Sequence, residues 1–350
     1  MVKKDLRKGE PNSANSRAFQ HHSATFRALL LTLGLIIALV LTMILALSQG
    51  AIKLNVIELW QALFRQGEAT QQTIIWDLRI PRIMSGVLVG ASLGMSGAML
   101  QGMLRNSLAD SFVLGISSGA GLIAVILITV LKAQALVPMG AWIGALISVT
   151  IVFALGYQGG RIVSERLILG GIAIATLSGS AQTLLLLFAD EGQVQGVLNW
   201  LIGSLNGRGW AELHLVAPYV VIALISGCLL GKTINLLNLG NEMAVSLGVS
   251  LVRSRILIGA TASLLAASAV SISGLIGFVG LVVPHGVRLI IGNDYRWVLP
   301  TSAIAGALVL TLADLLCRIG SIEFPVGAVT ALLGSPLFIW LLYRRRQGVF

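Results

Sequence analysis

The sequence predicts an all-α polytopic membrane protein with about ten transmembrane helices. Its 350 residues are 56% hydrophobic and only 11% charged, and their mean hydropathy is +0.90. A soluble domain would carry about 25% charged residues. The apolar runs are continuous and long enough to cross a bilayer as helices, whereas a membrane β-barrel would show short alternating strands. These observations argue against a soluble fold and against a barrel.

The expected spans cover almost the whole chain between two short tails. Residues 1–27 form a polar, basic tail that is too long for the charged region of a signal peptide, so we expect it to be retained in the cytoplasm. Residues 28–345 form a single transmembrane domain, and residues 346–350 form a C-terminal tail. Spans are expected at 28–47, 83–103, 112–130, 136–155, 167–188, 213–230, 256–272, 275–291, 299–316 and 326–343.

The distribution of basic residues predicts which side of the membrane each loop faces. Most of the 24 Lys and Arg residues fall in the first tail, in alternate loops and after the last span. Because cytoplasmic loops carry an excess of Lys and Arg, both termini are expected in the cytoplasm of a multi-pass protein of the plasma (inner) membrane. The net charge of +10 therefore reflects topology in contact with membrane lipid, and no nucleic-acid partner is expected.

Two longer connections separate some of the spans. Residues 48–78 carry Trp60 and Trp76, and residues 189–212 carry Trp200 and Trp210. Trp is enriched at membrane–water interfaces, so both connections are expected to lie there, the second as a short helix.

A row of small residues marks the span at 83–103. Gly86, Gly90 and Gly94 are four residues apart and therefore lie on one side of a helix, where they leave a groove for a neighbouring helix. Helix packing is the favoured interpretation of this row, and a role in building a transport path is the alternative.

The two halves of the chain resemble each other weakly. In each half, paired arginines precede a helix rich in small residues, and a glycine-rich break follows, which is GLIGFVG in the second half. By the expected topology the two copies enter the membrane from opposite sides. Inverted repeats of this kind are typical of transporters, although similar composition alone would also produce the likeness.

No motif points to covalent chemistry. Residues 227–233 resemble a phosphate-binding loop but have one residue too few between the glycines, and they end a membrane span. Cys228 and Cys317 lack CxxC spacing, and the four histidines form no ligand set. We therefore expect no catalytic residue, metal site or cofactor, and we do not expect an enzyme.

Asp314 is an acid well inside an apolar run. A proton-coupled transporter would use such an acid as a carrier. Arg318 lies four residues later on the same helical face, so a local ion pair is the favoured interpretation.

Three arginines are expected on the outer side, against the positive-inside bias. They are Arg79, Arg82 and Arg318. They could anchor in lipid headgroups or pair locally, Arg79 with Asp77 and Arg318 with Asp314. Alternatively they receive carboxylates of a partner, because a planar guanidinium grips a carboxylate through two hydrogen bonds.

The inner connection at 240–248 reads GNEMAVSLG and predicts a short amphipathic helix between two glycines. Such a helix could present an apolar surface to a cytoplasmic partner. The residues expected to matter are Gly240, Asn241, Glu242, Ala244, Leu247 and Gly248.

Several of these segments occur together in one known family. RIPR before the small-residue span, RNSLAD followed by LGISSGAG, GNEMAVSLG, GLIGFVGLVVPH and PVGAVTALLGSPLFIW stand here in one order. The chain thereby resembles the FecCD-type permeases of binding-protein-dependent ABC importers for iron-siderophores, haem and cobalamin. The resemblance covers roughly residues 29–345.

The resemblance implies partners and roles for individual residues. Such permeases have ten helices, form homo- or heterodimers around a central path, bind two ATP-binding subunits, and receive cargo from a periplasmic or lipid-anchored solute-binding protein. By position, 240–248 would be the coupling helix to the ATPase, and Arg79, Arg82 and Arg318 would engage glutamates of the binding protein. Ser164 and Glu165 would form the cytoplasmic gate, although Glu165 departs from the small hydroxylated residues common there.

The implied function is transport of cargo driven by ATP hydrolysis on the partner subunits. An iron-siderophore is the default cargo over haem and cobalamin. The alternative from another class is an ion-coupled secondary transporter that uses Asp314.

Overall fold

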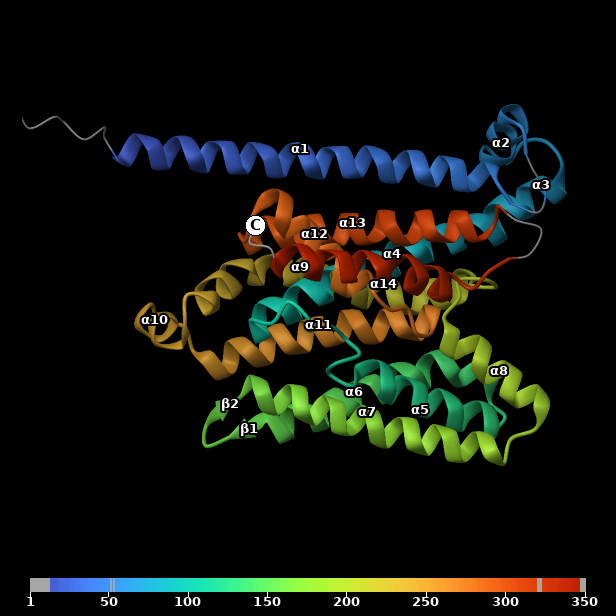
Figure 1. The fold of residues 1–350 in the computed structure, drawn as a ribbon. Coiled ribbons are helices and arrows are strands. Elements are labelled where there is room, and N and C mark those ends of the chain that lie inside the picture. Colours follow the sequence, from blue (N-terminus) through green and yellow to red (C-terminus); the bar gives the residue numbers. More distant parts are fainter. Residues whose placement is uncertain (1–12, 51, 53, 320–322, 347–350) are drawn as a thin grey trace, which may run out of the picture.

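The computed structural model describes residues 13–50, 52, 54–319 and 323–346, and it confirms the all-α prediction (Figure 1). The first half contains α1 (Ser13–Ser48), α2 (Val56–Leu63), α3 (Ala69–Thr73), the π-helical turn η1 (Ile74–Arg79), α4 (Ile80–Leu104), α5 (Ile116–Thr129), η2 (Gln134–Leu136), α6 (Val137–Gly156), β1 (Tyr157–Gln158), β2 (Arg161–Ile162) and α7 (Ser164–Leu187). The second half contains α8 (Glu191–Ile202), α9 (Trp210–Asn238), α10 (Asn241–Ser246), α11 (Leu251–Ser273), α12 (Val279–Ile291), α13 (Tyr295–Cys317) and α14 (Val326–Arg346).

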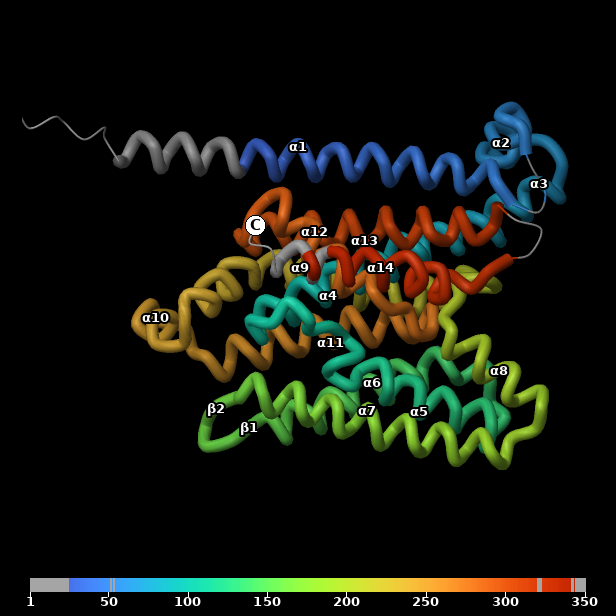
Figure 2. Tube along the Cα trace, viewed as in Figure 1, coloured from blue at the N-terminus to red at the C-terminus, as the bar shows by residue number. Residues whose placement is uncertain are grey.

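The long helices lie side by side, and the short elements gather at the two ends of the bundle. Helix α10 and the β1–β2 hairpin lie at one end, whereas α2, α3 and α8 lie at the other (Figure 1). The charge pattern predicts that the α10 end faces the cytoplasm, so we call it the inner end and the opposite end the outer end. The tube in Figure 2 shows α11 running from the α10 end toward the outer end. There the Ser273 carbonyl accepts a hydrogen bond of 2.8 Å from the Ser204 amide.

Seven helical segments among the described residues are long and apolar enough to cross a membrane. They are Thr25–Ser48, Ala69–Leu104, Gln134–Gly156, Ser164–Leu187, Trp210–Asn238, Leu251–Ser273 and Tyr295–Cys317. Three shorter apolar helices, Ile116–Thr129, Val279–Ile291 and Val326–Trp340, occupy the remaining expected positions. The number of ten crossings therefore stays a prediction.

The ends of several spans differ from those predicted. Helix α1 begins at Ser13, inside the predicted tail 1–27, whose first twelve residues lie outside the described part, as do 347–350 of the C-terminal tail. The span expected at 275–291 begins at Val279, because 274–278 is not helical. Phe278 there has a φ of 66°, which a bulky side chain rarely adopts. The GLIGF segment is therefore a break between α11 and α12.

Helix α4 lies at the centre of the core, and most of its residues after Arg82 are buried. Gly90 and Gly94 face α13 so closely that a Cβ at Gly90 would overlap the carbonyl oxygen of Gly306, and one at Gly94 that of Ser302. Gly86 has more room, since its Cβ would lie 3.3 Å from Leu205 Cδ1. The Gly90 and Gly94 positions thus let two helix backbones touch, as small residues do in membrane helix pairs.

The hairpin between α6 and α7 was not predicted. Tyr157 pairs with Ile162 and Gln158 with Arg161, and the connecting Gly159 and Gly160 have φ values of 56° and 75°. A two-residue turn with positive φ at both positions matches the right-handed twist of paired strands, and Gly-Gly is a known signal for it. The hairpin fixes where α7 begins.

Replacing Gly90 by leucine should destabilise the folded protein, because no side chain fits between the α4 and α13 backbones. Overpacking of this kind costs about 1–3 kcal/mol or more. We expect a loss of monodisperse protein in detergent and a lower thermal midpoint. The matched control is Gly34→Leu, since a Cβ at Gly34 of α1 meets no atom within 4 Å. Equal yield and stability of the two variants would contradict the tight contact.

Candidate functional site

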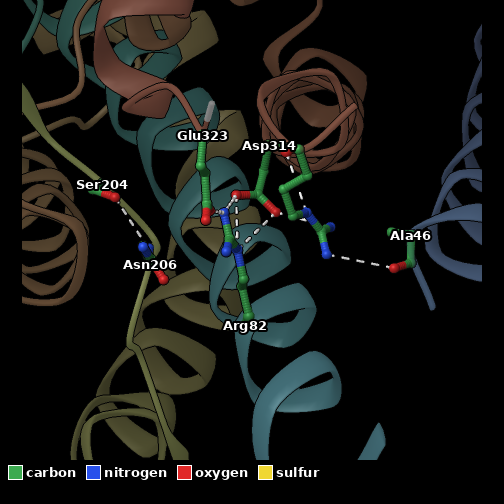
Figure 3. A network of polar contacts seen from close by, with 7 residues as sticks. Ala46, Arg82, Ser204, Asn206, Asp314 and Glu323 are labelled. Carbon is green, nitrogen blue, oxygen red and sulfur yellow. Dashed lines mark hydrogen bonds and ion pairs between the residues drawn. The ribbon is translucent and has the colours of Figure 1, made fainter. Parts of the chain in front are cut away.

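The outer end of the bundle holds a cluster of charged side chains from two helices and a loop. Arg82 at the start of α4, Asp314 and Arg318 at the end of α13, and Glu323 before α14 form this outer charge cluster. Figure 3 shows Arg82 reaching between Asp314 and Glu323. Two of the expected docking residues, Arg82 and Arg318, thus come together around the one acid that the sequence singled out.

Asp314 is held from two sides. Arg82 Nη2 lies 2.7 Å from Asp314 Oδ1, and Arg82 Nε lies 3.1 and 3.2 Å from the two carboxylate oxygens. Arg318 Nη2 lies 3.0 Å from Asp314 Oδ2, which is the predicted i,i+4 pair. Asp314 is 2% exposed, so its charge has little contact with solvent and depends on the two guanidiniums.

Glu323 completes the cluster from the loop before α14. Its carboxylate contacts Arg82 Nη2, and its side chain is 37% exposed. The cluster therefore joins two arginines to two acids, with one acid deeply buried and the other open to solvent.

Arg79 is also buried, although it was expected at an exposed rim. It is 6% exposed, and its guanidinium donates to the carbonyl oxygens of Leu47 and Ile52. It therefore holds the connection between α1 and α2. The local pairing with Asp77 considered from the sequence is replaced by these backbone contacts.

A cavity of about 890 Å³ opens beside the outer charge cluster. Arg79, Arg82, Arg318 and Glu323 line it, together with Arg208 from the loop before α9. Burial lowers the pKa of Arg208, and nearby Glu212 offsets this only in part. Arginine side chains thus outnumber acids around the cavity, which favours an anionic partner group.

At the inner end, α10 projects from the bundle between α9 and α11. Met243, Val245 and Leu247 are each a little more than half exposed, whereas Ala244 is fully buried. Gly240 and Gly248 flank the helix with φ values of 114° and 83°. The apolar surface expected at 240–248 exists, but Ala244 is part of its support and does not face outward.

Ser164 and Glu165 begin α7 directly after the hairpin. They line an open cavity of about 1170 Å³ together with Asn241 and Glu242 of α10. The residues expected for a gate and those expected for coupling, which are distant in sequence, therefore face the same space. Arg105 and Arg255 line it too.

Sequence reasoning missed Glu323, Arg105, Arg208 and the role of Arg255. Glu323, Arg105 and Arg255 contact residues distant in the chain, and Arg208 lies in a loop beside Glu212. Hydropathy carries no signal for such positions. A Gly-Gly turn could have indicated the hairpin that Arg255 reaches. Within the described ranges, no group of three or more His, Cys, Asp or Glu side chains could hold a metal ion.

The alternative transporter mechanism depended on Asp314 as a proton carrier. Both of its carboxylate oxygens accept N–H groups from Arg82, Arg318 forms an ion pair with it, and the side chain is buried. This arrangement is that of a structural ion pair, so the ion-coupled alternative finds no support here.

The sequence matches the model of the FecCD transport family over residues 38–344. The chain is 39% identical over 324 residues to the hemin transport system permease protein HmuU of Yersinia pestis, with 88% of this chain and 95% of that protein covered. It is 41% identical over 277 residues to the cobalamin import system permease protein BtuC of Halobacterium salinarum, with coverages of 79% and 75%. It is 36% identical to the Fe(3+)-citrate import system permease protein YfmD of Bacillus subtilis, with coverages of 93% and 99%.

The fold matches a solved structure described as an inward-facing conformation of a metal-chelate type ABC transporter. The TM-score is 0.81 at 30% sequence identity, and the match covers 89% of this chain and 98% of that one. Sequence and fold therefore point to the same kind of protein, in agreement with the resemblance found in the motifs.

Replacing Asp314 by asparagine should destabilise the folded protein strongly, because Arg318 would lose its acid partner and Arg82 one of its two. Removing one partner of a buried ion pair costs about 3–5 kcal/mol. The thermal midpoint in detergent measures the effect. Glu323→Gln is the matched control, since Glu323 is 37% exposed and a carboxylate in contact with solvent contributes only about 0.2–1 kcal/mol to such a pair. If Asp314→Asn were as stable as Glu323→Gln, the cluster would not hold the outer end together.

Proposed function

This chain belongs to the FecCD transport family, and we propose that it is the transmembrane permease subunit of an ABC importer. The main support is the match to a solved ABC transporter over nearly the full length of both chains. It is a multi-pass protein of the inner membrane. We propose ten crossings from the apolar runs of the sequence, and we propose from the charge pattern that both termini lie in the cytoplasm.

The proposed role is passive, in that ATP is hydrolysed on partner subunits. Family membership implies ATP-binding and solute-binding partners. The exposed apolar side chains of α10 support contact with an ATP-binding subunit, because a short apolar helix face at the membrane surface suits insertion into a groove. We propose that a second permease subunit, identical or different, completes the path, and that Ser164 and Glu165 gate it.

The proposed cargo is a metal chelate or a tetrapyrrole. The similar permeases are named for haemin, cobalamin and ferric citrate, so an iron-siderophore, the default from the motifs, is one candidate within this class. Cargo and binding protein would arrive at the outer end.

We place binding-protein docking at the outer cavity. Arg79, Arg82 and Arg318 are engaged within the chain, so a carboxylate that binds one of them would have to replace an existing partner. Glu323 is the partner most open to solvent, and Arg82 is the arginine that would be released. Docking would then exchange one carboxylate for another on Arg82.

Reconstitution tests the proposed function. The full chain is purified with ATP-binding subunits and a solute-binding protein from the same organism and is placed in liposomes. Separate assays follow uptake of haemin, cyanocobalamin, ferric citrate and a ferric hydroxamate. We expect uptake of one class that requires ATP and both partners. Uptake by the purified chain alone, driven by a proton gradient, would contradict the proposal.

Glu323→Gln should strengthen association with the solute-binding protein, because it frees a donor of Arg82 without removing Arg82 from Asp314. Exposed pairs contribute about 0.2–1 kcal/mol, so the dissociation constant should fall by up to about fivefold at low salt. Asp77→Asn is the control, since Asp77 is exposed in the same cavity. Its replacement removes one negative charge from the cavity without releasing Arg82. Equal effects of both variants, or weaker binding of Glu323→Gln, would rule out the exchange at Arg82.

A further inference from the structure

One amide oxygen at the inner end receives hydrogen bonds from two helices. Arg105 Nη2 donates to Asn241 Oδ1 at 2.7 Å, and Arg255 Nη2 donates to the same oxygen at 3.3 Å. Arg105 follows the last turn of α4, Asn241 is the first residue of α10, and Arg255 lies in the second turn of α11. Asn241 therefore joins α10 to the ends of α4 and α11.

Arg255 also reaches the hairpin. Its Nη1 donates to the carbonyl oxygen of Ile162 in β2, two residues before α7 begins at Ser164. Arg255 is 8% exposed, although it borders the inner cavity. Its guanidinium thus holds α10 with one nitrogen and the hairpin with another.

The connection that Arg255 makes between α10 and the hairpin lies beside the inner cavity. The inner cavity separates α10 from the start of α7, so side chains there do not pack into a continuous apolar core. A displacement of α10 can then reach the hairpin through bonded contacts, and Arg255 supplies one that ends beside Ser164. The fixed planar fork of a guanidinium suits this task, because it sets the separation and direction of two acceptors.

We propose that Arg255 is the positioning residue that transmits displacement of α10 to the hairpin and thereby to Ser164 and Glu165. This inference rests on the proposed function, in which α10 contacts the ATPase and Ser164 and Glu165 form the gate. Asn241 connects α10 to Arg255, and the carbonyl oxygen of Ile162 connects Arg255 to the hairpin.

The first experiment tests the link in the full-length permease alone. Spin labels are attached at Gln158→Cys in the hairpin and Val245→Cys in α10, both exposed positions, with Cys228 and Cys317 replaced by serine and alanine. Pulsed electron resonance in nanodiscs gives the distance distribution. We expect a narrow distribution that broadens with Arg255→Lys, because a compact ammonium does not reproduce the spacing of the two guanidinium nitrogens that hold the two acceptors. An unchanged distribution would overturn the link.

The second experiment tests transmission in the reconstituted complex, with the unlabelled chain and the probe that the wild type transports. ATP hydrolysis and uptake are measured together. With Arg255→Lys we expect hydrolysis within about twofold of wild type and about tenfold less uptake per ATP, as the loss of a charge-assisted hydrogen bond allows. The control is Arg253→Gln, an exposed neighbour on the same helix.

The outcomes separate the two claims. If Arg255→Lys left the ratio of uptake to ATP hydrolysis unchanged, whether or not both rates fell, transmission through Arg255 would be ruled out and Arg255 would be a structural residue. If the wild-type complex showed no ATP-driven uptake, the proposed function would fail, and the label distances would still decide whether Arg255 joins α10 to the hairpin.

Discussion

The structure depends on the close approach of α4 to its neighbours. At Gly90 and Gly94 the α4 backbone touches α13, and at Gly97 it touches Gly280 of α12, with no room for a Cβ. Membrane helices gain little from the hydrophobic effect between one another, so such backbone contact supplies much of their association. It also sets the register of α4 against α13. That register brings Arg82 to Asp314 at the outer end and leaves Arg105 beside Asn241 at the inner end.

The two ends of α4 carry different kinds of contact. At the outer end, Asp314 is buried between Arg82 and Arg318, an arrangement that is costly to disturb. At the inner end, arginines bridge an open cavity to a small helix and a hairpin. We interpret the outer end as a rigid opening in which a carboxylate of a partner can replace one acid, Glu323, on Arg82. The inner end is then the place where movement enters, with α4 as the fixed reference.

The sequence predicted what depends on local composition and helical spacing. The apolar runs located the long helices, the four-residue spacing located the glycine contact, and the i,i+4 spacing located the pair of Asp314 with Arg318. Pairing across 232 residues, as between Arg82 and Asp314, depends on how helices dock and has no local signal. The burial of Arg79 likewise depends on how its connection docks, because its guanidinium donates to the carbonyl oxygens of Leu47 and Ile52. The order of the motifs along the chain indicated the family, whereas the spacing of residues within any one segment did not.

The central claim is that movement enters at α10 and passes to the hairpin while α4 stays fixed. Hydrogen–deuterium exchange on the assembled complex in nanodiscs, without nucleotide and with ATP and vanadate, tests it most directly. We predict that exchange changes together in 240–248 and 157–166, with no change in 86–98. A change in the α4 segment, or a response of one inner segment without the other, would contradict the account.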